Sequence, residues 1–220
     1  MDRSKLLAPG MIAPLVLATA AIPQMAAAYE TLPRSLAQLS PEDFAERVEI
    51  LNDPLEETIV LSTRDAYASG RSVKGAYAED VHIRALADRE SGKISWQIWH
   101  DFIHAGRRKE LHAIHYLSGG RLHKAAPVLV EHWLDQCPPT DGLGSCKQFV
   151  RVIFELPEHA IREAAASYRQ GSREPWRIRF KSAAGKDITS GIAPAEAAGL
   201  IQAVDAWRGG TGGRMMARND

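Results

Sequence analysis

The sequence predicts an α+β fold: an antiparallel β-sheet, or a small sandwich of short strands, with two helices packed on it near the C-terminus. Two observations predict it. Apolar and polar residues alternate through the middle of the chain, most clearly over 94–104, with the period of two that is typical of half-buried strands. In 157–170 and 194–208 the apolar residues instead recur at helical spacing, and a proline opens each segment.

The N-terminal part is expected to be a lead-in over 29–52, extended over 29–39, with one short helix. The run Ser40-Pro41-Glu42-Asp43 indicates the start of that helix, since it combines a hydroxyl cap, a proline in the first turn and two acids. We expect one globular domain over 53–208, a loop over 64–78 and a disordered tail over 209–220. The predicted strands are 57–63, 81–86, 94–104, 110–117, 128–134, 148–155, 176–181 and 187–190.

The first 28 residues have the pattern of a signal peptide. Residues 1–5 are basic, residues 6–22 are mostly apolar, and 26–28 are three alanines of the kind that a signal peptidase reads. We therefore expect cleavage after Ala28 and a periplasmic or secreted protein.

An uncleaved membrane anchor is the alternative for this segment. The apolar run is shorter than the roughly 20 residues that a spanning helix needs, and Pro9, Gly10 and Pro14 interrupt it. No later segment is long and apolar enough to span a membrane, so no transmembrane span is expected after cleavage.

Composition argues against nucleic acid as a partner. Lysine and arginine number 27, equal to the 27 aspartates and glutamates, whereas proteins that release counterions from nucleic acid carry a basic excess. Apolar residues make up 45% of the chain, which suffices for a core.

The two cysteines, Cys137 and Cys146, flank a short loop that contains two prolines and two glycines. In an oxidising compartment such a pair is expected to form a structural disulfide. A reactive pair is the alternative, although the spacing does not match a CxxC redox motif.

Several segments carry a family resemblance. They are DPLE at 53–56, LST at 61–63, VHIRA at 81–85, the turn at 88–92, WQI at 96–98, the cysteine segment and the two later helices. In these the chain resembles a group of exported bacterial proteins of unknown function. It is more distantly similar to exported invasion-associated proteins, through a late cysteine pair followed by strand, helix and strand. The resemblance implies a location outside the cytoplasm and an antiparallel α+β fold, and it supplies no catalytic residue.

Histidines gather in one part of the chain, and imidazole binds zinc and copper at neutral pH. If 106–109 form a four-residue turn, His100 lies opposite His115 in a β-hairpin, close enough to share a metal ion. The alternative is that the imidazoles are half-buried polar groups on a sheet surface. The six clustered histidines are His100, His104, His112, His115, His123 and His132.

No motif for nucleophilic or metal-dependent catalysis occurs, since GxSxG, SxxK and HExxH are all absent from the sequence. The expected function is therefore that of an exported, non-catalytic envelope protein that binds an unidentified ligand or an envelope or extracellular partner, without a cofactor. The alternative is a metal-binding protein or metal-dependent enzyme that uses zinc or copper at the histidine hairpin.

Two further groups of residues are candidates for contact with a ligand. The basic residues of 107–109, together with Arg121 and Lys124, are expected at hairpin tips, where they are solvated or contact an acidic surface outside the cell. The five tryptophans are expected mainly in core packing, with the lining of a ligand pocket as the alternative. They are Trp96, Trp99, Trp133, Trp176 and Trp207.

Peptide mapping without reduction should find Cys137 linked to Cys146 within one chain. Reduction should then lower the melting temperature by about 5–12 °C without abolishing the fold, because closing so short a loop removes only part of the unfolded chain's entropy. Two thiols that alkylate freely in the native exported protein would contradict the predicted disulfide.

Overall fold

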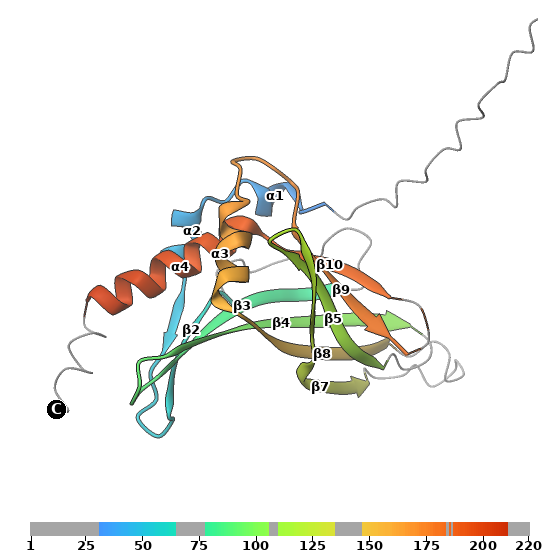
Figure 1. Ribbon diagram of the computed structural model, residues 1–220, viewed down its shortest axis with the longest axis horizontal. Helices are drawn as coiled ribbons and strands as arrows, with labels where there is room; N and C mark the ends of the chain where they lie inside the picture. The colour runs from blue at the N-terminus through green and yellow to red at the C-terminus, as the bar shows by residue number, and fades with distance from the viewer. Residues whose placement is uncertain are drawn as a thin grey trace, which may run out of the picture.

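The computed structural model of this protein describes residues 31–64, 78–105, 110–134, 147–183, 185 and 187–210. Within these residues the chain forms two antiparallel sheets and four helices, which confirms the predicted α+β class (Figure 1). One sheet has six strands in the order β1-β2-β3-β4-β8-β7, and the other has four in the order β10-β9-β5-β6. The helices are α1 (Arg34–Ala37), α2 (Pro41–Ala45), α3 (Glu158–Ala166) and α4 (Pro194–Gly209).

The strands of the six-stranded sheet are β1 (Glu49–Leu51), β2 (Thr58–Ser62), β3 (Ala78–Asp88), β4 (Ile94–Ala105), β7 (Pro127–Leu134) and β8 (Lys147–Leu156). Those of the four-stranded sheet are β5 (Leu111–Ser118), β6 (Arg121–Ala125), β9 (Trp176–Ser182) and β10 (Ile188–Ile192). Each strand that the sequence predicts is present, within a few residues of its expected bounds. No helix among the described residues is long and apolar enough to cross a membrane.

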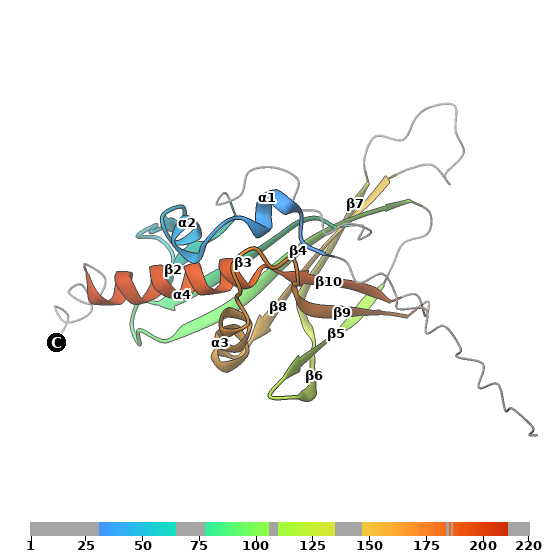
Figure 2. The ribbon, with the colours of Figure 1, turned by 90° about the horizontal axis from the view of Figure 1, so that it is seen from above.

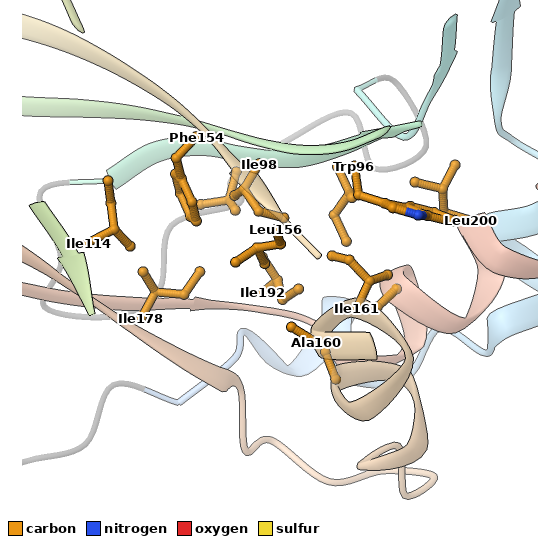
Figure 3. Close-up of a cluster of buried hydrophobic side chains, with 14 of the residues drawn as sticks. Trp96, Ile98, Ile114, Phe154, Leu156, Ala160, Ile161, Ile178, Ile192 and Leu200 are labelled. Atoms are coloured by element: carbon orange, nitrogen blue, oxygen red, sulfur yellow. The ribbon is translucent and has the colours of Figure 1, made fainter. Parts of the chain in front are cut away.

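The core lies between the two sheets and under the two longer helices. The four-stranded sheet, α3 and α4 lie side by side over one face of the six-stranded sheet (Figures 1 and 2). Side chains from both sheets and from both helices meet there (Figure 3). Those labelled in the close-up are Trp96, Ile98, Ile114, Phe154, Leu156, Ala160, Ile161, Ile178, Ile192 and Leu200.

The alternation along β4 is the pattern that the sequence predicts. Trp96, Ile98, His100 and Phe102 are buried on the core face, and each is at most 2% exposed. The residues between them are only half-buried and lie on the opposite face. The apolar period of two therefore determines which face of this strand enters the core.

The expected hairpin between 94–104 and 110–117 is wrong. Strand β4 pairs with β3 and β8, whereas β5 pairs with β6 and β9 in the other sheet. Arg121 and Lys124, expected at a hairpin tip, lie on strand β6; Arg121 directly follows the Gly119-Gly120 turn, whereas Lys124 is further along the strand. The local sequence is compatible with either pairing, and the apolar faces of β4 and β5 bury more completely when they face each other across a core.

The N-terminal segment differs in part from the expected extended lead-in. The start of α2 is as predicted, because the Ser40 side chain accepts from the Asp43 amide and the Asp43 carboxylate accepts from the Ser40 amide. Just before it, α1 forms a single helical turn that sequence reasoning missed. Its residues Leu36 and Ala37 are buried against Phe44 and Ala195, so burial in the tertiary structure decides its conformation.

The hairpin of β5 and β6 is attached to α3 by one carboxylate. Gly119 and Gly120 form its two-residue turn with φ of 57° and 70°, the left-handed conformation that such a turn requires. Glu163 accepts hydrogen bonds from the Ser118 hydroxyl (2.5 Å) and the Gly119 amide (2.8 Å), and these bonds lower the pKa of its carboxyl group. The outer face of this hairpin is thereby held in a defined orientation.

The first turn of α4 is attached to the six-stranded sheet through buried polar groups. The Thr63 hydroxyl donates to the Glu196 carboxylate (2.5 Å) and accepts from the Ile83 amide (2.9 Å). Glu196 is only 2% exposed, and its position in the first turn places its carboxyl group near the positive end of the helix dipole.

Helix α4 approaches α2 so closely that only glycine fits at position 199. A Cβ atom on Gly199 would lie 2.4 Å from the Pro41 carbonyl oxygen and 2.5 Å from the Phe44 Cβ. We predict that Gly199→Ala lowers the free energy of unfolding by about 1–3 kcal/mol, because the two helices must separate. Denaturant unfolding followed by circular dichroism measures the change.

Gly209→Ala is the matched control. Gly209 lies in the same helix, and a Cβ there has nothing within 4 Å. We expect this variant to be as stable as the wild type or slightly more stable, because alanine has the higher helix propensity. Equal losses of stability at the two positions would contradict the close packing of α2 on α4.

Candidate functional site

The outer face of the four-stranded sheet, which points away from the core, carries the candidate site. On β5 the side chains of Ile114 and Tyr116 enter the core, so His115 between them points outward. On β9 the buried Ile178 and Phe180 place Arg179 on the same outer face. The site is therefore a direct consequence of the alternation that builds the core.

Cross-strand pairing aligns these outward side chains in rows across the sheet. In one row Thr189 lies opposite Arg179, Arg179 opposite His115, and His115 opposite Lys124. Two residues further along the strands, Leu117 lies opposite Leu122. Successive rows on one face of a sheet are about 7 Å apart, so a polar, basic row is followed by an apolar pair.

The surface is hollowed beside these rows into two adjoining depressions of about 370 and 280 Å³. They share Leu117 and Arg177, and we call them together the outer groove. The larger is lined by His115, Tyr116, Leu117, Leu122, Arg177, Ile178, Arg179 and Thr189. The smaller, toward the segment between α3 and β9, is lined by Leu117, Arg177, Arg169, Ser172, Glu174 and Trp176, among others.

Basic side chains predominate in and beside the outer groove. Arg177 pairs with the exposed Glu174 (3.0 Å), and Lys181 pairs with Asp187. Within the described part of the chain, the side chains of Arg179 and Lys124 make neither a hydrogen bond nor an ion pair. These two cations are accordingly available to a ligand, in a protein whose formal net charge is zero.

The electrostatic effect of these cations is seen at His115. Partial burial lowers the pKa of its imidazole most, and the positive charges of Lys124, Lys181 and Arg179 lower it further, while Asp187 opposes them. The neutral form is therefore favoured at neutral pH. An anion in the groove would offset the field of these cations and raise the pKa of the imidazole, which in its protonated form donates from both ring nitrogens.

The structure does not bring together the predicted metal pair, His100 and His115, and their expected cross-strand pairing is wrong. His100 pairs with Val81 and Val152 and lies on the core side, where its ring stacks on Phe102 (centroids 4.0 Å apart). His115 lies on the outer face of the other sheet. The physical reason is that β4 and β5 belong to different sheets, so the four-stranded sheet separates the two imidazoles.

The remaining clustered histidines do not replace that pair. His112 is exposed on β5, while His123 turns inward and stacks on Tyr116 (5.4 Å). Among the residues that the structure describes, no three histidine, cysteine, aspartate or glutamate side chains lie close enough to hold a metal ion. The predicted signal peptide over 1–28 and the predicted disulfide between Cys137 and Cys146 lie outside the described residues.

A serine and a histidine do meet inside the core, where His100 Nε2 lies 2.5 Å from Ser190 Oγ. Such a pair suggests nucleophilic catalysis. Both residues, however, are almost completely buried, at 0% and 1% exposure, with Phe102 and Phe180 against the imidazole. A substrate cannot reach the hydroxyl in this conformation, and the pair serves to hold β10 on the six-stranded sheet.

The outer face of the six-stranded sheet also carries charged and aromatic side chains. There the arginines contact tryptophan rings and a carboxylate of the same face. The guanidinium of Arg84 lies 3.8 Å from the centre of the Trp99 ring. Arg151 makes two hydrogen bonds of 2.8 Å to Asp101 and lies 5.4 Å from the Trp99 and Trp133 rings. These contacts connect neighbouring strands, so we assign these groups to stability.

The tryptophans agree only in part with the expected core packing. Trp96 is buried, whereas Trp99 is half-buried on the outer face and Trp133 is 39% exposed and stacked on Phe149. Trp176 is half-buried, contacts Tyr116 (5.5 Å) and lines the smaller depression of the outer groove. One of the five thus borders a pocket, which was the alternative interpretation.

Sequence reasoning identified Lys124 as a residue that could contact an acidic surface, but it missed Arg177, Arg179 and the groove. The alternation of arginine and lysine with apolar residues over 176–181 was a usable signal for an outward basic face. The sequence does not reveal that β5 lies beside β9. Comparison with protein-family models, curated proteins and solved structures finds no match, so the site is interpreted from its own geometry.

Removing the charge of Lys124 should raise the pKa of the His115 imidazole, because a neighbouring cation disfavours the protonated ring. A titration of the imidazole resonances by NMR, in the wild type and in Lys124→Gln, measures the shift. Lys93→Gln, in the turn between β3 and β4, is the control and should leave His115 unchanged. If the two variants titrate His115 alike, Lys124 does not lie beside it.

Proposed function

We propose that this protein is an exported interaction domain that binds a negatively charged partner through the outer groove. The signal-peptide pattern of the first 28 residues supports the exported location. The observation that carries the proposed function is the collection of basic groups around one groove of a chain with no formal net charge. Five basic side chains lie in or beside the groove, with two carboxylates among them. The five are Lys124, Arg169, Arg177, Arg179 and Lys181.

The chemistry of these groups favours an anion. A carboxylate that approaches Arg179 and Lys124 would make charge-assisted hydrogen bonds with donors that form no hydrogen bond or ion pair among the described residues. Asp187, whose charge acts on Arg179, is itself paired with Lys181. Arg179 presents a planar fork that matches the two oxygens of a carboxylate. The neighbouring His115 is able to add a third donor once it is protonated.

The alternative function, metal binding through His100 and His115, is not supported, because the two side chains lie on opposite sides of the four-stranded sheet. Catalysis by His100 and Ser190 is likewise not supported, since both are buried. An interaction surface requires only accessible side chains that complement a partner, without a reactive group or a cofactor. The exposed outer groove provides such side chains.

Charge reversal in the groove tests the proposal. We expect Arg179→Glu and Lys124→Glu each to weaken binding of fluorescein-labelled poly-glutamate by about tenfold or more, because each replaces an attraction by a repulsion. Fluorescence polarisation at low ionic strength, where screening is weak, gives the dissociation constants.

Lys93→Glu makes the same change of charge at an exposed site in the turn between β3 and β4, and it is the matched control. It should bind poly-glutamate nearly as well as the wild type. Equal weakening by all three variants would mean that only the overall charge matters. That result, or no binding by the wild type, would contradict a site in the groove.

A further inference from the structure

We infer that the partner bound in the outer groove is an acidic protein segment in which an apolar side chain lies between two carboxylates. The inference rests on the proposed function and specifies the chemistry of its ligand. The observation behind it is that two exposed leucines, Leu117 and Leu122, lie among the basic side chains. A site that recognised charge alone would not need them.

Leu117 and Leu122 are each 60% exposed, although both lie on paired strands of the sheet. As cross-strand partners they form one contiguous aliphatic patch on the outer face. Leu117 lines both depressions, so this patch lies where the two depressions join. Neither side chain enters the core, and covering the pair would remove apolar surface from water.

Basic groups lie on both sides of this aliphatic patch. The row of Arg179, His115 and Lys124 lies two residues away along the strands, at the larger depression. Arg177 borders the patch, and Arg169 lines the smaller depression beyond it. Along the groove the basic row is therefore followed by a row that holds the leucine pair with Arg177 at its side. Arg169 and the exposed Glu174 lie in the smaller depression beyond it.

An extended peptide matches this order in both chemistry and spacing. Every second side chain of an extended chain points the same way, at intervals of about 7 Å, which is the spacing of the rows on the sheet. A segment with acid, apolar and acid at alternate positions thus places one carboxylate at Arg179 and Lys124. Its apolar side chain covers Leu117 and Leu122. The second carboxylate takes the place of the exposed Glu174 as the partner of Arg177, with Arg169 nearby in the smaller depression.

The aliphatic character of the patch favours a peptide over an acidic polysaccharide. Sugars offer apolar surface mainly as ring faces, which pack on flat aromatic rings. The most exposed apolar groups here are the branched side chains of Leu117 and Leu122, whereas the Trp176 ring in the smaller depression is half-buried against Tyr116. Aliphatic side chains of a protein segment pack on such groups. Acidic polysaccharides supply the charge without this complementarity.

Two blocked, fluorescein-labelled peptides test the inference. One is Gly-Glu-Ser-Leu-Ser-Glu-Gly, and the other has serine in place of the leucine, so both carry the same charge. We expect the wild-type protein to bind the leucine peptide about fivefold more tightly, as partial burial of one leucine side chain implies. In the double variant Leu117→Ser/Leu122→Ser this preference should disappear while poly-glutamate still binds.

Leu55→Ser is the matched control, because Leu55 is 92% exposed in the turn between β1 and β2, remote from the groove. It should keep the fivefold preference. Thermal melting of each variant confirms that the fold is retained, as expected for substitutions on a solvent-facing side.

The outcomes separate this inference from the proposed function. If wild type binds both peptides equally and Arg179→Glu still weakens both, the apolar requirement is overturned while the anionic site stands. If dextran sulfate binds more tightly than either peptide and independently of the two leucines, the ligand is an acidic polysaccharide and the inference is overturned. If none of the anionic probes binds, both proposals fail.

Discussion

The burial of one face of each sheet against the other is the constraint on which the rest of this structure depends. Ile98, Phe102 and Phe154 from the six-stranded sheet pack against Ile114 and Phe180 from the four-stranded sheet. Side chains alternate between the two faces of a strand. Because one set is buried in this contact, the set between them must point to the outer face of each sheet. The outer groove is lined mainly by residues whose side chains this alternation directs away from the core.

The same constraint explains how buried polar groups are accommodated. His100 occupies a core position of β4, and it is tolerated there because its imidazole bonds the Ser190 hydroxyl and stacks on Phe102. Glu196 is buried at the start of α4, where the Thr63 hydroxyl and the helix dipole compensate for the loss of water. In both cases a polar side chain of a type often found in active sites stabilises the packing of the core.

The two outer faces contain similar residues in different arrangements. On the six-stranded sheet the arginines contact aromatic rings and carboxylates, so Arg84 covers Trp99 and Arg151 is bonded to Asp101. On the four-stranded sheet the side chains of Arg179 and Lys124 form no hydrogen bond or ion pair among the described residues, and exposed leucines lie beside them. Where charged groups already contact one another, an anionic ligand can add few new interactions. Where cations without such contacts lie beside an apolar patch, a ligand can both pair with the charges and bury the apolar surface. This contrast places the proposed binding site on the smaller sheet.

The sequence by itself determined the local structure of this protein. The period of two predicted the strands, the capping run at Ser40 predicted the start of α2, and proline predicted where the later helices begin, because these signals depend on neighbours in the chain.

Only the tertiary structure decided which strands pair. The sequence favoured a hairpin that set His100 against His115, whereas packing across the core placed β4 and β5 in separate sheets, one imidazole buried and the other at the surface. Likewise, Arg179, His115 and Lys124 are far apart in the chain and form one row only because β9, β5 and β6 are neighbours. Pairing depends on the total apolar surface that a fold buries, which is a property of the whole chain and not of any segment.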